Sequence, residues 1–448
     1  MEKNVMRELS NSTQLSSAIE AAMDRYIREN PDSARRHARA LKVMPGGNTR
    51  SVLHVDPFPI AFERGEGPYL WSVDGVRYTD FLGEFTAGLY GHSDPVILDA
   101  IRAALDRGLN YGGPNAFEHE LAELMCEKFP SMELVRFTNS GTEANLMALA
   151  LALNYTGRKK VLVFKGGYHG GVLAFGDGQP SPVTVPHQFL LGDYNDTEGT
   201  RELIGSNEDD LAAILIEPML GSGGCIPAEH EFLEMLRQEA TRVDAVLIFD
   251  EVMTSRLGPS GVQGLENITP DLTTLGKYLA GGMSFGAFGG TQDLMAAYDP
   301  TRSISLIHSG TFNNNVLSMS AGIASLRATL SSDAVEQLNA RGDRLRSALN
   351  AVAERRDVPL HVSGRGSVMT IHPSRRCLNA SEGLSTVQSL LRDILFFGLV
   401  SGKKWLARRG MIALSLPITD AHCHDLVAEF DNVVERNASL FHSSGESV

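Results

Sequence analysis

The middle of the chain contains three short, continuous apolar runs, KVLVF, AAILIEP and AVLIFDE, separated by helical or loop segments. Runs this short, rich in β-branched residues, are typical of strands that are buried on both faces of a mainly parallel sheet. Because helical patterns alternate with the runs, the sequence predicts an α/β fold. A long helical pattern, LSSDAVEQLNARGDRLRSALNAVAERR, then predicts a smaller α+β unit beyond about residue 325.

The chain of 448 residues is long enough to bury a large core, and we divide it into three parts. Residues 1–91 are predicted to form an N-terminal arm and part of the small domain, including a hairpin in PYLWSVDGVRYTDF. Residues 92–325 are predicted to form the large domain that contains the sheet. Residues 326–448 are predicted to form the C-terminal small domain.

Charge and cysteine content limit the function classes. The chain has 40 Lys and Arg against 54 Asp and Glu, a formal net charge of −14, which disfavours attraction to nucleic acid or to an anionic membrane. Its four widely spaced cysteines include no CxxC pair and suit a reducing compartment. The first thirty residues lack the apolar core of a signal peptide, and no apolar run approaches the roughly 20 residues that span a bilayer. We therefore expect a cytoplasmic protein that binds neither nucleic acid nor membranes.

The stretch FTNSGTEANLMALALAL places Ser140, Gly141 and Thr142 directly before a strongly helical sequence. A helix N-terminus offers free backbone N–H groups and the positive end of the helix dipole, and glycine lets a ligand approach the backbone closely. With the Thr142 hydroxyl as an extra donor, this helix start is a candidate phosphate site. The same residues also fit an ordinary capped helix, and both interpretations stay open for this stretch alone.

Asp250 and Glu251 stand at the C-terminal end of the run AVLIFDE, where open α/β sheets bind ligands. An acid at this place fits a cationic ligand group, the magnesium-binding strand of a nucleotide hydrolase, or a simple turn cap. The hydrolase requires the loop GxxxxGK[ST]. That loop is absent from the sequence, because Gly276-Lys277 is followed by Tyr278 and the earlier glycine is missing.

Lys277 lies in PDLTTLGKYLAGGMSFGAFGG, between a short apolar run and a glycine-rich segment. Partial desolvation helps a lysine amine lose its proton, which makes it a nucleophile. The helix start, the strand-end acid and the lysine follow one another in the order that a pyridoxal 5'-phosphate (PLP) site needs. The helix start would hold the phosphate, Asp250 would keep the ring nitrogen protonated, and Lys277 would bind the aldehyde as a Schiff base.

From about residue 40 to near its end, the chain resembles the class III (fold type I) PLP-dependent aminotransferases. The motifs RFTNSGTEANLMAL, GGYHGG, IEP, FDEVMTS, DLTTLGKYLAGGMSFGAFGG and HSGTFNNN follow in family order. The resemblance implies the family fold, with a mainly parallel seven-stranded sheet in the large domain and a smaller α+β domain. It also implies a homodimer with shared active sites, because Thr311 matches the family threonine that reaches the phosphate of the neighbouring subunit.

The resemblance further implies roles for single residues. Lys277 and Asp250 would be catalytic, and Tyr168 and Val252 would cover the two faces of the cofactor ring. The cofactor-binding residues would be Ser140, Gly141, Thr142, Tyr168, Glu217, Asp250, Val252, Lys277 and Thr311.

Within this family, GEFTAGLYGHS, KGGYHGGVLAFG and RRGMIALSLP are similar to the aromatic β-amino acid (β-phenylalanine) aminotransferases. That group moves an amino group from a donor like 3-amino-3-phenylpropanoate to a 2-oxo acid, here 2-oxoglutarate or pyruvate, and releases a 3-oxo acid. MPGGNTRSV, GAFGG and Met253 are also similar to glutamate-1-semialdehyde aminomutase. The alternatives are this aminomutase, an ω-amine transaminase and, outside enzymes, an inactive ligand-binding regulator.

Two arginines, Arg50 and Arg409, match substrate-binding positions of the β-phenylalanine group. A guanidinium grips a carboxylate with two parallel hydrogen bonds, and a transaminase must accept both an amino acid and an oxo acid. Arg408 is an alternative to Arg409, because alternation along a strand points only one of two neighbours inward. Four residues are candidates either for an aromatic side-chain pocket or for the core: Val52, Phe81, Phe85 and Tyr90.

Two histidine motifs point to structure rather than chemistry. AHCHD brings together His422, Cys423 and His424, but adjacent side chains rarely converge on one ion, so we expect a helix start and no metal site. His169, in GYHGG, is expected to pack beside the cofactor.

Overall fold

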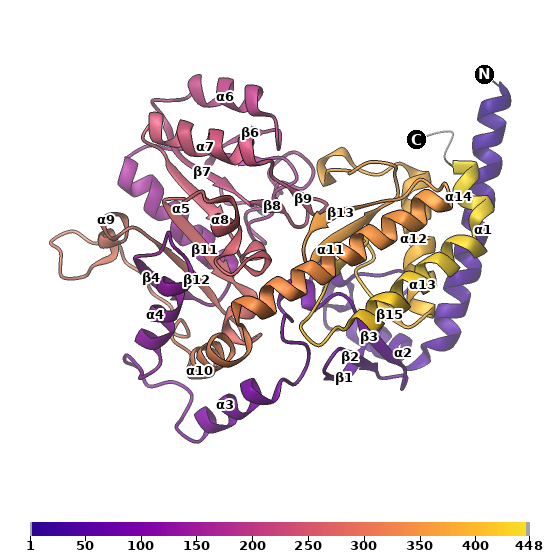
Figure 1. Ribbon diagram of the computed structural model, residues 1–448, viewed down its shortest axis with the longest axis horizontal. Coiled ribbons are helices and arrows are strands. Elements are labelled where there is room, and N and C mark those ends of the chain that lie inside the picture. The colour runs from indigo at the N-terminus through magenta and orange to yellow at the C-terminus, as the bar shows by residue number, and fades with distance from the viewer. Residues whose placement is uncertain (1, 445–448) are drawn as a thin grey trace.

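The computed structural model describes residues 2–444, and a large twisted sheet forms the centre of one half of the molecule (Figure 1). Within the described residues seven strands form this sheet, in the order β4-β12-β11-β10-β7-β5-β6. Only β12 runs antiparallel to its neighbours, so the predicted mainly parallel seven-stranded sheet is confirmed. The strands are β4 (Leu134–Thr138), β5 (Lys160–Phe164), β6 (Gln188–Gly192), β7 (Leu211–Ile216), β10 (Val246–Asp250), β11 (Leu272–Gly276) and β12 (Gly286–Gly290).

The three apolar runs form β5, β7 and β10, and every residue of β7 and β10 is buried. Helix α5 packs on one face of the sheet, and Phe232 and Leu233 of α7 lie in the apolar cluster on the other. Burial on both faces explains why these strands are apolar throughout rather than alternating. The helices of this half are α3 (Pro95–Leu105), α4 (Glu118–Lys128), α5 (Gly141–Thr156), α6 (Thr197–Gly205), α7 (His230–Arg242), α8 (Gly261–Glu266), α9 (Gln292–Met295) and α10 (Val316–Ala324).

The other half combines both ends of the chain. The predicted hairpin is present, and its second strand pairs in parallel with a strand near residue 404, so N-terminal and C-terminal segments share one sheet. This sheet contains β1 (Phe62–Glu66), β2 (Tyr69–Ser72), β3 (Arg77–Asp80) and β15 (Lys404–Trp405). A further sheet contains β13 (His361–Arg365), β14 (Val368–His372) and β16 (Met411–Ala413), and the short pair β8 (Met219–Leu220) and β9 (Ile226–Pro227) lies beside the large sheet. The domain boundaries after residues 91 and 325 stay a prediction.

Long helices cover the second half (Figure 1). The predicted long helix is α11 (Ser332–Arg355), which runs from the large sheet toward the chain ends. The other helices of this half, long and short, are α1 (Glu2–Glu29), α2 (Pro31–Ala40), α12 (Thr386–Ser401), α13 (Asp420–Arg436) and α14 (Ala438–Ser444). Thr419 caps α13 together with His422, so the expected helix start is confirmed there. Within residues 2–444, every helix falls short of the length and apolar character needed to cross a membrane.

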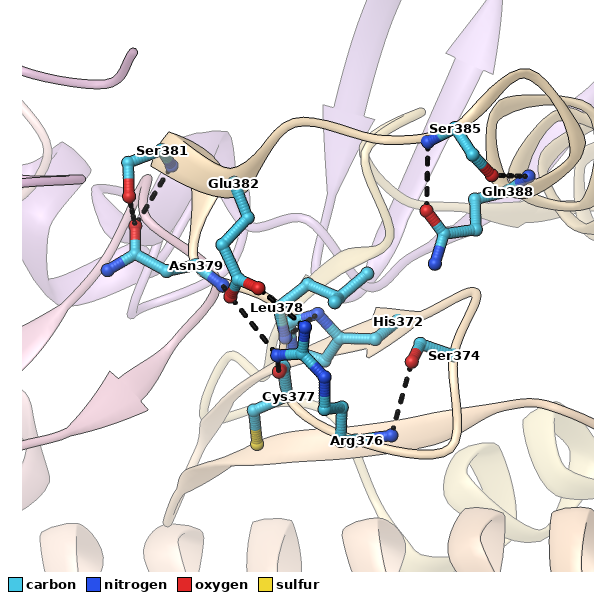
Figure 2. Close-up of polar contacts among 10 residues, drawn as sticks. All are labelled: His372, Ser374, Arg376, Cys377, Leu378, Asn379, Ser381, Glu382, Ser385 and Gln388. Carbon is cyan, nitrogen blue, oxygen red and sulfur yellow. Dashed lines mark hydrogen bonds and ion pairs between the residues drawn. The ribbon is translucent and has the colours of Figure 1, made fainter. Parts of the chain in front are cut away.

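A loop over residues 373–385 links β14 to α12 within the second half, and Figure 2 shows polar contacts along it. Burial lowers the pKa of His372, at the start of the loop, to about 4, so its ring is neutral. One ring nitrogen accepts a hydrogen bond from the Leu378 N–H at 3.3 Å, which folds the loop back on β14. Further along, the Ala380 N–H donates to the Gly223 carbonyl at 3.1 Å. The loop is thereby fastened to the segment that follows β8.

Candidate active site

A cavity of about 560 Å³ lies at the C-terminal ends of β10 and β11 and at the N-terminal end of α5. Residues that are far apart in the sequence meet there. Those of the predicted site residues that line the cavity are Arg50, Ser140, Gly141, Thr142, Tyr168, Glu217, Asp250, Val252, Lys277 and Arg409. Thr311 is exposed, and it lies outside the lining of its own chain's cavity.

The start of α5 leaves no room for side chains at two glycines. An added Cβ at Gly141 would lie 2.7 Å from Val252 Cγ2, and one at Gly170 would lie 2.2 Å from Thr142 Oγ1. Real Cβ atoms essentially never make such contacts, so a larger residue at either position would force Val252 or Thr142 to move. The Ser140 hydroxyl accepts a hydrogen bond from the backbone N–H three residues later, at 3.2 Å. It therefore caps the helix, and the first helical residues, Gly141 and Thr142, line the cavity.

The buried Asp250 carboxylate is held by three partners. Asp250 Oδ2 lies 2.8 Å from His169 Nδ1 and accepts a hydrogen bond from Asn145 Nδ2 at 2.8 Å. Asp250 Oδ1 accepts from the Val252 N–H at 3.0 Å. The Asn145 amide is fixed in turn by the Thr274 hydroxyl, which donates to Asn145 Oδ1 at 2.7 Å. The carboxylate therefore has a defined orientation at the wall of the cavity.

The sequence analysis does not predict the contacts of two of these partners with Asp250. His169 was expected only to pack, but its buried ring also bonds to Asp250. Asn145 was missed, although its position gave a signal, since it follows Thr142 by three residues and so lies on the same face of α5.

Glu251, the second acid of this strand end, serves another purpose. Its buried carboxylate accepts hydrogen bonds from the Val262 and Gln263 N–H groups at 2.8 and 2.9 Å and from the Thr254 hydroxyl at 3.0 Å. These contacts hold the carboxylate at the start of α8, outside the residues that line the cavity.

Lys277 follows β11 directly and has a left-handed backbone conformation, with φ at 57°. Its Nζ donates a hydrogen bond to the Phe85 carbonyl at 2.5 Å. Burial, followed by the positive charge of Arg409, lowers the pKa of Lys277 to about 8, while Asp250 and Glu217 act in the opposite direction. The amine therefore loses its proton far more readily than an exposed lysine does.

Glu217 joins two loops at the cavity wall. Its carboxylate accepts hydrogen bonds from the Tyr168 N–H at 3.0 Å and from the Gly221 N–H at 3.2 Å. Burial raises the pKa of Glu217 to about 7, and the nearby carboxylate of Asp250 adds to this effect. Tyr168 and Gly221 thereby keep fixed positions at the lining of the cavity.

Of the two neighbouring arginines, Arg409 lines the cavity and Arg408 does not. Arg408 forms a two-pronged ion pair with Asp393, with contacts of 2.9 and 2.6 Å. Arg409 is partly buried, and this desolvation lowers its pKa. Its Nη2 lies 3.1 Å from Met411 Sδ, and its Nε has no hydrogen-bond partner within the described part of the chain. The cavity therefore contains a partly buried cation that has no carboxylate partner among the residues that the structure describes.

Arg50 enters the same cavity in a different state. Its Nη2 donates to Glu84 Oε1 at 2.8 Å, and both side chains are about half exposed. The guanidinium groups of Arg50 and Arg409 lie 5.8 and 5.3 Å from the centroid of the Phe85 ring. These distances allow cation–π attraction to the ring.

The four apolar candidates separate into two pairs. Val52 and Phe85 line the cavity. Phe81 and Tyr90 are buried in the largest hydrophobic cluster and belong to the core. For these two residues the pocket interpretation was wrong, because their side chains pack between the strands and helices that support the site.

This constellation fits PLP. The helix start suits an anionic phosphate, the oriented Asp250 carboxylate suits a protonated ring nitrogen, and the Lys277 amine of lowered pKa suits an aldehyde. The fold and these groups together define a PLP-dependent aminotransferase. The sequence pattern of the class-III aminotransferases matches residues 51–434, and the chain belongs to this family.

Individual relatives indicate which members of the family the chain is similar to. A β-phenylalanine transaminase of Variovorax paradoxus is 49% identical over 423 residues, which cover 94% of this chain and 97% of the relative. The crystal structure of a β-phenylalanine aminotransferase from that organism superimposes with a TM-score of 0.93 and covers 95% of this chain and 99% of its own. A glutamate-1-semialdehyde 2,1-aminomutase of Rhodopirellula baltica is 39% identical, over 76% of this chain and 81% of the relative. The resemblance stated from the motifs is confirmed.

Proposed function

We propose that this enzyme transfers the amino group of an aromatic 3-amino acid, such as 3-amino-3-phenylpropanoate, to 2-oxoglutarate or pyruvate and releases a 3-oxo acid. The observation that carries the proposal is the presence of two guanidinium groups, Arg50 and Arg409, in the cavity of Lys277. Each guanidinium suits a carboxylate. The Phe85 ring, which lies near both guanidinium groups, suits contact with an aromatic side chain of the substrate. The name of the relative that is 49% identical supports the same substrate class.

The proposed chemistry assigns a task to each residue. When PLP is bound, it withdraws electrons from the amine-bearing carbon of the donor and makes its proton acidic. Lys277 Nζ removes that proton as a general base, which its pKa of about 8 permits near neutral pH. Asp250, held by His169 and Asn145, keeps the ring nitrogen protonated.

The remaining assigned residues hold the cofactor. The Gly141 N–H and the Thr142 hydroxyl would bind the phosphate, and Tyr168 and Val252 would cover the two faces of the ring. Glu217 acts indirectly, because its hydrogen bonds fix the backbone at Tyr168.

The two arginines divide the carboxylates between them. Arg409, a partly buried cation without an acidic partner in the described part of the chain, takes the carboxylate of the 2-oxo acid, and Arg50 takes that of the amino donor. A 3-amino acid carries its carboxylate one carbon further from the reacting carbon than a 2-amino acid does. A 2-amino acid held at Arg50 would therefore place its carbon out of line with Lys277 Nζ, and a misplacement of about 1 Å costs on the order of 100-fold in rate.

The test is a direct assay of purified, PLP-loaded protein. 3-Amino-3-phenylpropanoate should be converted with 2-oxoglutarate or pyruvate as acceptor, and 2-amino-3-phenylpropanoate should react about 100-fold more slowly. Glutamate-1-semialdehyde should not be isomerised. Efficient isomerisation would instead place the enzyme among the mutases. Equal turnover of 1-phenylethylamine, with no gain from the carboxylate, would place it among the ω-amine transaminases.

A homodimer with shared active sites belongs to the same proposal. Thr311 lies in an exposed segment away from the cavity of its own chain, so it contacts a phosphate only if a second chain supplies that phosphate. Dilution to monomers should then release the cofactor. A monomer that keeps full activity at the same concentration would contradict the shared site. The proposed location is the cytoplasm, since all four cysteines are free, as suits a reducing compartment.

A further inference from the structure

Glu84 places a carboxylate inside the cavity, on the arginine that we assign to the amino donor. Glu84 and Arg50 both line the cavity, and their ion pair measures 2.8 Å. The exposed fractions of the two side chains are 57% and 47%, so solvent and ligands reach the pair. An amino donor that binds Arg50 through its carboxylate meets a site that another carboxylate already occupies.

The backbone that carries Glu84 is strained. Glu84, Phe85 and Thr86, which form the turn η3 (Glu84–Thr86), have left-handed φ angles of 47°, 53° and 79°. L-residues avoid this conformation, and three in succession persist only where the surrounding structure imposes them. One such restraint is the fully buried Arg256, whose Nη1 donates to the Thr86 carbonyl at 3.2 Å. The position of Glu84 is therefore built into the fold.

The two arginines of the cavity thus differ in their resting state. Arg409 has no carboxylate partner among the described residues, whereas Arg50 is neutralised by Glu84. A carboxylate that binds Arg409 gains an unpaired cation. A carboxylate that binds Arg50 must first displace Glu84, while a ligand without a carboxylate leaves the pair intact.

We propose that Glu84 is a specificity-determining residue, an internal carboxylate that competes with the carboxylate of the amino donor for Arg50. The inference rests on the proposed function for the identity of that donor. It adds that the enzyme holds its carboxylate-bearing donor less tightly than the arginine alone would, which favours release of the 3-oxo acid product from the same position. Replacement of the Glu84 carboxylate by the ligand carboxylate at Arg50 therefore determines how strongly the enzyme prefers a carboxylate to its neutral analogue.

The size of the effect follows from the exposure of the pair. Ion pairs between exposed side chains have net strengths that correspond to about a 1.5- to 5-fold change in an equilibrium constant. The substitution Glu84→Gln keeps the shape of the side chain and removes its charge. It should therefore tighten the binding of a carboxylate at Arg50 by about 1.5- to 5-fold and leave a neutral analogue unaffected.

The test uses PLP-loaded enzyme and two ligands that lack an amine and are not turned over: 3-phenylpropanoate and its neutral analogue 3-phenylpropanamide. Isothermal titration calorimetry gives the Kd of each for wild type, Glu84→Gln and a matched control, Glu66→Gln. Glu66 pairs with Arg64 at 3.0 Å with exposed fractions of 65% and 55%, outside the residues that line the cavity. The expected result is a lower Kd for 3-phenylpropanoate in Glu84→Gln alone, with the Kd of the amide unchanged.

Several results would overturn the proposal. They are an unchanged or higher Kd for 3-phenylpropanoate in Glu84→Gln, an equal change for the amide, or no detectable binding of the carboxylate to either protein. Persistence of the tightening in an Arg50→Met background would also overturn it, because Glu84 would then act on another group. These titrations measure binding and not turnover. Failure to convert 3-amino-3-phenylpropanoate would therefore refute the proposed function without deciding the role of Glu84.

Discussion

Arg409→Met separates the functional from the structural role of the unpaired arginine. The partly buried guanidinium has Met411 Sδ and the Phe85 ring as neighbours but no carboxylate partner within the described residues. Met keeps most of the apolar stem and removes the charge. Loss of one partner from a buried charge pair costs about 2 to 5 kcal/mol. We therefore expect the apparent affinity for the 2-oxo acid to fall by about 30- to 5,000-fold.

The same substitution should stabilise the protein in the absence of substrate. A buried charge without a partner is unfavourable, and its replacement by an apolar side chain contributes on the order of 1 kcal/mol or more. The measurement is the free energy of unfolding by urea at a fixed protein concentration, together with single-turnover kcat/KM for 2-oxoglutarate. The half-reaction with the amino donor provides an internal reference, since that carboxylate is assigned to Arg50.

The neighbouring residue offers a control of opposite sign. Arg408→Met breaks the two-pronged pair with Asp393, which is only 11% exposed, and leaves that carboxylate with Arg392 as its remaining ion-pair partner. It should destabilise the protein and leave the affinity for the 2-oxo acid unchanged. If Arg409→Met keeps the affinity for 2-oxoglutarate within about threefold of wild type, or lowers stability as Arg408→Met does, the argument from the missing partner is refuted.

Three further changes test the cofactor side of the cavity. His169→Phe removes a hydrogen bond to the buried Asp250 carboxylate, worth about 1.5 to 3 kcal/mol, so kcat should fall about 10- to 150-fold; an unchanged kcat would show that Asp250 does not need His169. Gly141→Ala would place its Cβ 2.7 Å from Val252 Cγ2, so PLP titrated by fluorescence into the cofactor-free protein should bind about 10-fold more weakly or worse; a wild-type Kd would contradict this. The pKa of Lys277 falls from 10.5 to about 8 on folding of the cofactor-free protein, so the unfolded chain binds more protons between these values. The free energy of unfolding should rise with pH through this window relative to Lys277→Met, and parallel pH profiles of the two proteins would refute the shift.

The sequence predicts those parts of the fold that depend on the pattern of neighbouring residues. The apolar runs of β5, β7 and β10 are continuous because helices cover both faces, so burial alone identifies them. The parallel pairing of β15 with β3 has no such signal. It joins residues 404–405 to residues 79–80, and nothing in either short segment names its partner.

The cavity shows the same division. The sequence singles out Asp250 and Lys277 because Asp250 ends a strand of recognisable composition and Lys277 directly follows one, and the structure brings both to one cavity. The sequence does not predict a role for Glu84, because its place in the cavity depends on a left-handed turn. Glu84 is not a glycine, so its residue type gives no sign of that conformation. Arg408 and Arg409 were left open because only the contact with Asp393 distinguishes them.

The loop over residues 373–385 influences the cavity without touching the chemistry. Its contact with Gly223 holds the segment in which Gly221 and Ser222 line the cavity, yet the loop itself contributes none of the lining residues. Surface loops accept substitutions and length changes far more readily than strands or helices do. We therefore expect that substitutions in residues 376–382, whether they arise by evolution or in a library, reshape one wall of the cavity. Such changes would alter the substrate preference and leave Lys277 and Asp250 unchanged.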